Sequence, residues 1–293
     1  MTKVIILAYD FPPYVSVGGL RPYAWFKYLK KFDVYPIVIT RQWQNKYGNE
    51  LDYISEGNSN TIIHEKFENG EIIRTPYKPN LSNKLLLKYG PNRFKWIRKF
   101  ISAYFEFFKF LIPAGPQKNI YFGAKEYLKK NKVDLIIASG SPFILFKYAY
   151  RLSEKNKTPW IADYRDPWSQ NISYQNLHLF KKWNQIFEKK ALKKVYSIIT
   201  VSQFVADKIK VNCPNKKISI IPNGFDYDVV KKINNQNQNS DVLTLSYAGS
   251  IYNWHPVKIL FSTLEELLLN SAQFKLNLYG VNNPNEIEII LIL

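Results

Sequence analysis

The sequence predicts an α/β fold, in which a doubly wound parallel sheet is followed by the start of a second, similar domain. Three observations lead to this prediction. Short apolar runs alternate along the chain with segments of helical periodicity. The apolar runs are continuous, which is typical of strands buried on both faces of a parallel sheet. After residues 231–241, which are polar and rich in Asn and Gln, the alternation begins again.

The N-terminal segment contains a complete strand–helix–strand unit. Residues 3–8 (KVIILA) are a continuous apolar run and predict the first strand. After a loop with Pro and Gly, residues 21–32 carry large apolar side chains at helical spacing. Residues 34–40 (VYPIVIT) predict the second strand. Two strands joined through a helix in this way lie parallel in one sheet.

The same alternation continues further along the chain. Apolar runs predict four more strands, at residues 133–138, 159–163, 197–201 and 218–221. Periodic segments predict helices at residues 143–155, at residues 179–194 and up to about residue 210. Because helices that connect parallel strands pack on the sheet, we expect helices on both of its faces.

The chain divides into two predicted domains. Residues 1–230 form an N-terminal Rossmann-like domain, residues 231–241 are a linker, and residues 242–293 begin a C-terminal domain. The last segment predicts only a strand, a helix and a strand, at residues 243–248, 257–270 and 274–279. A doubly wound domain needs more strands, so we expect the second Rossmann-like domain to be incomplete, truncated in this sequence.

An insertion at about residues 80–112 interrupts the first domain and combines basic with aromatic residues. On a helix, one broad apolar stripe would contain Phe100, Ile101, Tyr104, Phe105, Phe108 and Leu111. A cationic helix with an aromatic face suits the surface of an anionic membrane. A helix packed on the protein with a solvated basic end is the alternative, and the sequence leaves both open.

The composition limits the class of protein. The chain has 293 residues, of which 46% are hydrophobic, so it can bury a sizeable core. The net charge of +18 attracts anions, whether nucleotide phosphates, anionic lipids or nucleic acid. The sequence has no helix-turn-helix, zinc-finger or RNP-like motif, so we expect no specific nucleic acid partner.

Cysteine use and the N-terminus predict the compartment. The single cysteine, Cys213, cannot form an internal disulfide, which is typical of a reducing compartment. Residues 1–9 lead into an apolar run without a small-residue cleavage site, so we expect no signal peptide. No stretch reaches the roughly 20 apolar residues that span a bilayer. We expect a cytoplasmic protein, with a peripheral position at the inner face of the cytoplasmic membrane as an option.

Ligands of an open parallel sheet bind beyond the carboxyl ends of its strands, so candidate residues lie in the loops that follow them. In the first loop, Gly18 and Gly19 stand just before the predicted helix, where backbone N–H groups can approach a phosphate. Arg21 can add a charge-assisted contact. Ser139 and Ser141, after the third predicted strand, leave room for a ligand. A flexible turn is the alternative in each loop.

The loop after the predicted strand at residues 159–163 is rich in charge. Asp163, Arg165 and Asp166 are candidate catalytic residues, because a carboxylate beside a guanidinium can orient hydroxyl groups of a ligand such as a sugar. Trp168 offers a ring that can stack on a sugar face. A structural Asp–Arg pair that caps the loop is the alternative.

Two further loops contain glycine where backbone freedom is useful. Asn223 and Gly224 form a Pro-Asn-Gly turn just before the predicted linker, where a hinge is expected. Gly249 and Ser250 follow the first strand of the second domain. Gly249 there permits a phosphate to approach the backbone closely.

Taken in this order, the motifs resemble glycosyltransferase family 4, the retaining glycosyltransferases of the GT-B fold. The resemblance covers essentially all of residues 1–280. It rests on the FPP and GG–x–R pattern of residues 11–21, DYRDPW at 163–168, EKKALK at 188–193 leading into ITVS, IPNGFD at 221–226 and LSYAGS at 245–250. Each motif is weak singly, and five in register are strong.

The resemblance implies a hexosyltransferase that moves a sugar from a nucleotide-sugar donor, with retention, to a glycan or lipid-linked acceptor in surface polysaccharide or glycolipid biosynthesis. It implies an acceptor-side N-terminal domain, a donor-binding C-terminal domain, and neither cofactor nor metal. Gly18, Gly19 and Arg21 would border the donor phosphates, with Gly249 and Ser250 facing them. Arg165 and Asp166 would line the acceptor side, and Asp163 would contact the acceptor hydroxyl. Anionic membrane would be a partner of residues 80–112.

Two features depart from the family pattern. Glu286 and Glu288 lack the seven-residue spacing of the family's paired glutamates, and His255 competes with Lys258 for the place of a basic residue after the Gly-Ser loop. We therefore expect this truncated chain by itself to turn over little donor. A non-catalytic remnant, or a membrane-associated assembly protein that retains only the acceptor-side domain, is the alternative.

Overall fold

The computed structural model describes residues 1–44, 51–171, 178–226, 230–231, 242–249, 251, 255–270 and 273–279. The chain forms two compact units, Met1–Asp226 and Tyr227–Leu293, and each is described by itself. The linker predicted at residues 231–241 lies, apart from Lys231, outside the described residues.

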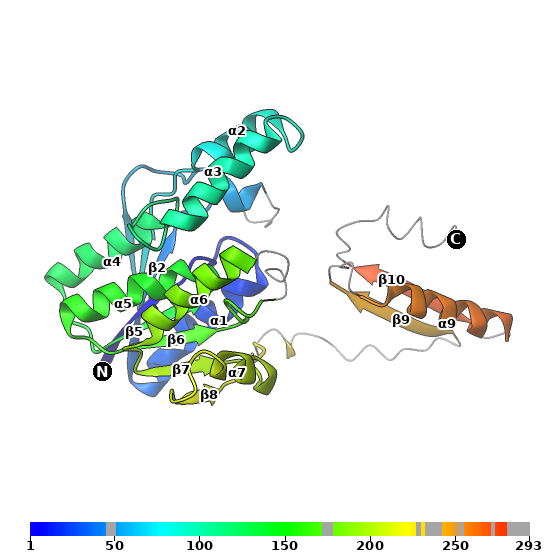
Figure 1. Ribbon diagram of the computed structural model, residues 1–293. Coiled ribbons are helices and arrows are strands. Elements are labelled where there is room, and N and C mark those ends of the chain that lie inside the picture. The colour runs from blue at the N-terminus through cyan, green and yellow to red at the C-terminus, as the bar shows by residue number, and fades with distance from the viewer. Residues whose placement is uncertain are drawn as a thin grey trace. The chain divides into compact units, whose positions relative to one another are not determined.

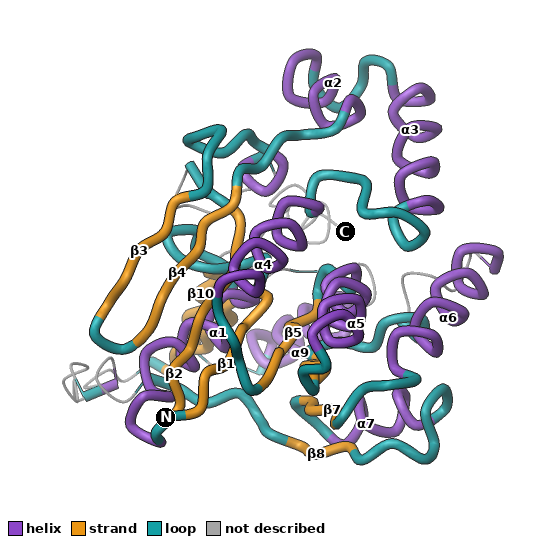
Figure 2. The backbone as a smooth tube through the Cα atoms, turned by 90° about the vertical axis from the view of Figure 1, so that its left-hand side faces the viewer, coloured by secondary structure: helices purple, strands orange, loops and turns teal. Residues whose placement is uncertain are grey.

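The first unit is built on one eight-stranded sheet with the order β3-β4-β2-β1-β5-β6-β7-β8 (Figures 1 and 2). Its strands are β1 (Thr2–Leu7), β2 (Val34–Arg41), β3 (Ile63–Phe67), β4 (Gly70–Thr75), β5 (Leu135–Gly140), β6 (Trp160–Tyr164), β7 (Ser197–Thr200) and β8 (Ile218–Ile220). Neighbouring strands are parallel, except that β3 runs antiparallel to β4. From β1 the chain first builds toward β4 and then returns to the other side of β1, so the winding reverses between β1 and β5.

Helices cover both faces of this sheet, as the sequence predicts (Figure 1). They are α1 (Val17–Tyr28), α2 (Leu81–Tyr89), α3 (Lys95–Phe108), α4 (Lys118–Lys130), α5 (Ile144–Asn156), α6 (His178–Leu192) and α7 (Gln203–Lys210). Side chains of α4, α5, α6 and α7 join the larger hydrophobic cluster, and α1 packs in a smaller one. The α/β, doubly wound class is confirmed.

Strand β1 shows why the predicted strands are continuously apolar. Ile5 and Leu7 belong to the larger cluster, whereas Val4 and Ile6 belong to the smaller one. Successive side chains of a strand point to opposite faces, so both faces of β1 are buried. Each fully buried aliphatic side chain contributes about 1.5–3 kcal/mol relative to an exposed one. The central strands therefore anchor the loops that follow them.

Local structure differs from the sequence prediction at helix α1. The helix begins at Val17, not at Arg21, because Ser16 has extended backbone and its side chain accepts a hydrogen bond from the Gly18 N–H. Gly18 and Gly19 consequently lie in the first helical turn and not in the loop before it. The 3₁₀ turn Leu29–Phe32 continues the helix toward β2.

The insertion predicted at about residues 80–112 contains a hairpin of α2 and α3 that projects beyond the sheet (Figures 1 and 2). Ser82 on α2 bonds to Ser102 Oγ and to the Arg98 carbonyl on α3. Because one side of α3 packs against α2, the predicted single apolar stripe is divided. Phe100 and Tyr104 are exposed, while Phe105 is half-buried.

The second unit contains one strand–helix–strand motif among its described residues. Strands β9 (Leu243–Ala248) and β10 (Phe274–Tyr279) pair in parallel, and α9 (Val257–Leu269) connects them. These elements confirm the strands predicted at residues 243–248 and 274–279 and the helix predicted at residues 257–270.

Candidate functional site

The winding of the sheet reverses between β1 and β5. Such a reversal opens a crevice at the carboxyl ends of the strands, which is where open α/β sheets bind ligands. Asp10 follows β1, and Arg165 follows β6. Gly140 is the last residue of β5, and Ser141 comes directly after it. A charged cluster therefore forms at this place from segments that are far apart in the sequence.

Asp10 and the start of α1 form the first half of the cluster. Asp10 Oδ2 accepts a hydrogen bond from Ser16 Oγ at 3.0 Å, and Ser16 Oγ accepts one from the Gly18 N–H at 3.0 Å. A Cβ atom on Gly18 would lie 2.2 Å from Asp10 Oδ2 and 2.4 Å from Arg165 Nη1. Only glycine therefore permits the carboxylate and the guanidinium to approach the helix together.

Arg165 forms the second half of the cluster. Its Nε donates to the Gly140 carbonyl at 2.7 Å and its Nη2 to the Ser141 carbonyl at 3.0 Å, so the end of β5 fixes the guanidinium. Burial raises the pKa of Asp10, and the positive charge of Arg165 offsets part of that rise. Oδ1 of Asp10 is buried and has no hydrogen-bond partner among the described residues. That oxygen is suited to accept a hydrogen bond from a ligand hydroxyl.

A second polar group lies deeper, around Asp163. Its Oδ1 accepts from Arg21 Nε at 3.0 Å and its Oδ2 from Ser139 Oγ at 2.8 Å. The side chain of Asp163 is 0% exposed; burial raises its pKa, and Arg21 offsets part of the rise. Arg21 Nη1 also donates to the Ile221 carbonyl at 2.9 Å and to Asn223 Oδ1 at 3.4 Å. Asp163 thus orients Arg21, which holds the turn after β8.

These contacts bear on three sequence expectations. Both oxygens of Asp163 are bonded to protein groups, and its contact with an acceptor hydroxyl stays a prediction. Arg21 is buried and pairs with Asp163, but its Nη2 has no hydrogen-bond partner among the described residues, so its contact with a phosphate stays a prediction. Trp168 is 1% exposed, and its indole N–H donates to Asn184 Oδ1 at 2.9 Å, so it is a core residue and not a sugar platform. Its ring stacks on Phe143 with centroids 5.3 Å apart.

The backbone N–H groups of the glycine pair serve the start of α1. The N–H groups of Gly18 and Gly19 donate to Ser16 Oγ and to the Ser16 carbonyl, so the helix cap uses both. Gly18 contributes by having no side chain, which leaves space for the side chains of Asp10 and Arg165. Asp166 and Ser141 are exposed beside Arg165, on the solvent side of the cluster.

The remaining sequence candidates lie on exposed turns. Asn223 and Gly224 are exposed after β8, and Arg21 bonds to the first of them. In the second unit, Gly249 has a φ of +144°, which only glycine adopts readily, and its N–H donates to the Tyr279 carbonyl at 2.9 Å. Ser250 lies outside the described residues.

The rival basic residues predicted after the Gly-Ser loop are placed differently. His255 Nδ1 lies 3.5 Å from the Tyr247 hydroxyl, whereas Lys258 is exposed on α9. Glu286 and Glu288 lie outside the described residues.

Sequence reasoning missed Asp10 and Ser16. Both carried a usable signal, since Asp10 comes just after the first strand and a serine before a helix is a common N-cap. What the sequence does not contain is the proximity of Asp10 and Arg165, whose side chains both approach Gly18. The two residues come together only because β1, β5 and β6 are neighbours in the sheet.

Residues 23–229 match the family model described as Glycosyltransferase Family 4. The chain belongs to Glycosyltransferase Family 4. The match covers more than half of the chain and includes α1 from Tyr23 onward, Asp163 and Arg165. Among curated proteins, none matches the sequence.

Solved structures resemble this family 4 chain in fold. Sucrose-phosphate synthase (tll1590) from Thermosynechococcus elongatus gives a TM-score of 0.58 at 16% identity, covering 97% of this chain and 64% of that one. The catalytic domain of starch synthase IV from Arabidopsis thaliana, bound to ADP and acarbose, gives 0.56 at 13% identity, covering 99% and 71%. TarM gives 0.56 at 12% identity, covering 100% and 74%. The chain therefore has the GT-B glycosyltransferase fold, and it spans about two thirds of the length of the synthase.

Within the described residues of this family 4 chain, no helix is both long and apolar enough to cross a bilayer. Nor does any group of three His, Cys, Asp or Glu side chains among them have the geometry to hold a metal ion.

Proposed function

We propose that this protein transfers a sugar from a nucleotide-sugar donor to a glycan or lipid-linked acceptor with retention, in surface polysaccharide or glycolipid biosynthesis. The observation that carries the proposal is the convergence of Asp10, Gly18 and Arg165 at the reversal of the sheet. Family membership supports the transferase class. The starch synthase domain of the same fold is bound to ADP and acarbose, which supports a nucleotide and a glycan as ligands.

The cluster contains the groups that such a transfer needs. Asp10 Oδ1, which lacks a protein partner among the described residues, is placed to hold the hydrogen of an acceptor hydroxyl. The Arg165 guanidinium is placed to stabilise negative charge on the departing phosphate, where a fixed cation in a partly buried site lowers the barrier most. Asp166 is exposed beside it and remains a candidate for acceptor contact. No metal is required in this scheme.

Asp163 and Arg21 act as positioning residues in the proposal. The buried pair ties α1 to the turn at residues 221–226, at the end of the first unit. Gly249 in the second unit would lie near the donor phosphates, because its missing side chain leaves space for a close approach although its N–H is bonded to the Tyr279 carbonyl. Ser250 would add a hydroxyl.

A donor screen followed by a transfer assay tests this function. The protein is titrated with UDP-, GDP- and other nucleotide sugars by saturation-transfer NMR, and transfer to glycan and lipid extracts is then measured. We expect one nucleotide class to bind. Asp10→Asn and Arg165→Ala should each reduce transfer by about 10²-fold or more, because each removes a group that acts on the reacting atoms.

Lys130→Ala, at the exposed end of α4, is the matched control and should leave transfer unchanged. Transfer at wild-type rates in both site variants would reject the assigned roles. If no donor binds, the protein is instead an acceptor-side assembly protein without catalytic activity. If donor binds without measurable turnover by this chain, the low activity expected from its departures from the family pattern is supported.

Helix α3 supports a second proposal, that the protein binds the anionic inner face of the cytoplasmic membrane. Trp96, Phe100 and Tyr104 are 73%, 78% and 58% exposed and recur at helical spacing along one side of the helix. The ammonium of Lys99 lies 4.9 Å from the centre of the Trp96 ring. Exposed aromatics with adjacent lysines are the groups that interfacial helices insert beside anionic headgroups.

Sedimentation with vesicles tests membrane binding. We expect the protein to bind phosphatidylcholine vesicles that contain phosphatidylglycerol, less so at high salt, and not vesicles of phosphatidylcholine alone. Phe100→Glu should weaken binding at least about tenfold, because it puts a like charge into the interface. Phe204→Glu on α7, where the side chain is 62% exposed, is the matched control. Equal losses in both variants would contradict the assignment to α3.

A further inference from the structure

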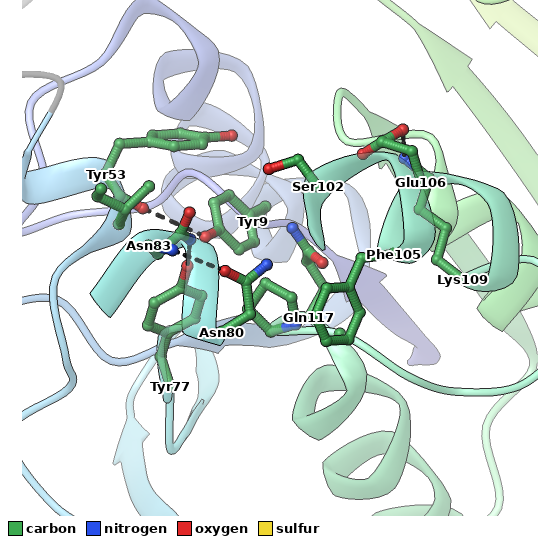
Figure 3. A pocket seen from close by; sticks show the side chains of 13 residues that line it. Tyr9, Tyr53, Tyr77, Asn80, Asn83, Ser102, Phe105, Glu106, Lys109 and Gln117 are labelled. Atoms are coloured by element: carbon green, nitrogen blue, oxygen red, sulfur yellow. Dashed lines mark hydrogen bonds and ion pairs between the residues drawn. The ribbon is translucent and has the colours of Figure 1, made fainter. Parts of the chain in front are cut away.

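A pocket lies at the base of the α2–α3 hairpin, outside the cluster of Asp10 and Arg165; we call it the hairpin pocket. Its volume is about 170 Å³. Its lining includes the rings of Tyr9, Tyr77 and Phe105 and the amides of Asn80, Asn83 and Gln117 (Figure 3). Because pockets for drug-sized ligands measure roughly 300–1,000 Å³, this one suits a single ring with its substituents.

The tyrosine wall of the hairpin pocket is held from behind by Arg41, which is 1% exposed. Its guanidinium lies 3.4 Å from the centre of the Tyr77 ring. Its Nη1 donates to the Tyr9 hydroxyl at 3.1 Å and to the Tyr53 carbonyl at 2.8 Å. The wall is therefore fixed before any ligand arrives, which lowers the entropy cost of binding.

The polar groups of the hairpin pocket suit hydroxyl groups. Asn80 Oδ1 accepts from the Asn83 N–H at 2.8 Å, which fixes its amide at the start of α2. Gln117 stands at the N-cap of α4 without a side-chain capping bond. Glu106 and Lys109 form an ion pair at 2.5 Å in the lining. Ring faces beside amides and a carboxylate match a sugar ring, which has apolar faces and a hydroxyl edge.

A second hollow of about 220 Å³ adjoins the hairpin pocket and shares Asn80 and Phe105 with it. Lys78 and Lys118 line this second hollow, and its lining contains neither Asp nor Glu. Two lysines without a carboxylate in the lining favour an anionic ligand group, such as a phosphate. The two hollows together thus combine a sugar-sized space with a cationic one.

The hairpin pocket also adjoins the candidate site. Tyr9 lines the pocket, and the next residue is Asp10. Tyr53 also lines the pocket. Burial raises the pKa of the Tyr53 hydroxyl most, and the negative charge of Asp10 raises this pKa further, so the Asp10 carboxylate is close enough to Tyr53 to affect it electrostatically. The pocket therefore lies near Asp10, although neither Asp10 nor Arg165 lines it.

We propose that the hairpin pocket and its lysine-lined neighbour bind a glycosyl phosphate, with the sugar ring in the first hollow and the phosphate in the second. This inference rests on the proposed function, because it names the acceptor of that reaction as a sugar that carries a phosphate. The same chemistry occurs in a free sugar phosphate and in the headgroup of a glycosylated lipid phosphate.

Calorimetric titration of the protein tests this proposal. The probes are a panel of hexose 1-phosphates, the matching methyl hexosides, and inorganic phosphate. We expect at least one hexose 1-phosphate to bind more tightly than its methyl hexoside and than inorganic phosphate. The double variant Lys78→Ala, Lys118→Ala should weaken that binding about tenfold, the size of a lost charge-assisted contact, and leave the methyl hexoside unaffected.

Two further variants make the result specific. Phe105→Ala, in the wall shared by both hollows, should weaken the hexose 1-phosphate and the methyl hexoside alike. The double variant Lys130→Ala, Lys132→Ala removes the same charge from exposed positions outside both linings and should change neither. Equal losses in the two lysine variants would overturn the proposal, because the phosphate would then respond only to net charge. Absence of binding by every sugar phosphate, free and lipid-linked, would also overturn it.

Vesicles distinguish the two sources of the ligand. Phosphatidylcholine vesicles with and without a polyprenyl glycosyl phosphate are sedimented with the protein. Binding of the free hexose 1-phosphates alone supports a soluble acceptor, and binding of the glycosylated vesicles alone supports a lipid headgroup.

The transfer assay separates this proposal from the function on which it rests. If Asp10→Asn abolishes sugar transfer while Phe105→Ala and the Lys78, Lys118 variant leave acceptor use unchanged, the transferase function stands and the pocket assignment is wrong. If the pocket binds hexose 1-phosphates as expected but no nucleotide sugar binds to the protein, the pocket assignment stands and the transferase function is wrong.

Discussion

At Gly18, a missing Cβ atom lets Asp10 and Arg165 approach the start of α1 together. Gly18→Ala should therefore displace one of these side chains, lower the stability by about 1–3 kcal/mol, and reduce transfer activity. Thermal unfolding and the transfer assay measure both effects. Gly224→Ala is the matched control, since a Cβ atom there meets nothing within 4 Å. An active, fully stable Gly18→Ala protein would contradict the packing described.

A buried carboxyl gives the molecule a pH dependence that can be measured at one residue. Glu188 is 0% exposed and accepts hydrogen bonds from the Tyr164 hydroxyl at 2.9 Å, from Asn212 Nδ2 at 2.8 Å and from Ser169. Burial raises its pKa above the ordinary 4.5, and the hydrogen bonds offset part of the rise. The folded state therefore binds this proton more tightly than the unfolded state.

The sign of the effect follows from that difference. The contribution of Glu188 to stability is greatest below its unfolded pKa of 4.5 and decreases as the pH rises through the raised folded value. Glu188→Gln removes the titration, so the stability difference between wild type and variant should change across this interval. Urea unfolding at a series of pH values measures it. A difference that is constant with pH would show that the pKa of Glu188 is unshifted.

At the scale of elements, two helices offer a matched comparison of their N-caps. Ser16 caps α1 inside the candidate site, and Ser202 caps α7 outside it, accepting from the Val205 N–H. Replacing either serine with alanine should cost about 1 kcal/mol, measured by urea unfolding. Only Ser16→Ala should also reduce transfer, because it releases Asp10 Oδ2. Equal transfer activity in the two variants would show that the Ser16 cap has no role in the candidate site.

The elements also show what local sequence can predict. The central strands were predicted because burial on both faces leaves a continuous apolar run, as in β1. The antiparallel strand β3 was missed because its sequence, IHEKF, is mostly polar and exposed at the edge of the sheet. Helix α4 was missed as well, in a segment rich in lysine.

The candidate site was predicted in part, and the limits are physical. Asp163 and Arg165 were predicted because they lie in a loop after a strand. The residue type alone does not distinguish a carboxylate that binds a ligand from one that binds another side chain. Trp168 is equally suited to a sugar face and to a core, and only the packing against Phe143 decides. The proximity of Asp10 and Arg165 at Gly18 depends on strand order, which no local pattern contains.

At the scale of the whole molecule, the first unit has its own core. Both hydrophobic clusters lie within Met1–Asp226. Asp226 itself is tied back to α1 by Lys27 Nζ at 2.7 Å and by the Tyr28 hydroxyl at 2.9 Å. A protein ending at Asp226 should therefore unfold cooperatively on heating, as calorimetry can show. A broad, non-cooperative transition would mean that the first unit depends on the second.

The α2–α3 hairpin has a consequence for how such proteins diverge. None of its residues belongs to either hydrophobic cluster of the first unit, so its sequence can change with little cost to folding. Selection for a new acceptor can therefore act on the hairpin while the sheet and its charged cluster stay constant. Related chains should differ most here, and exchanging hairpins between them offers a route to engineered acceptor specificity.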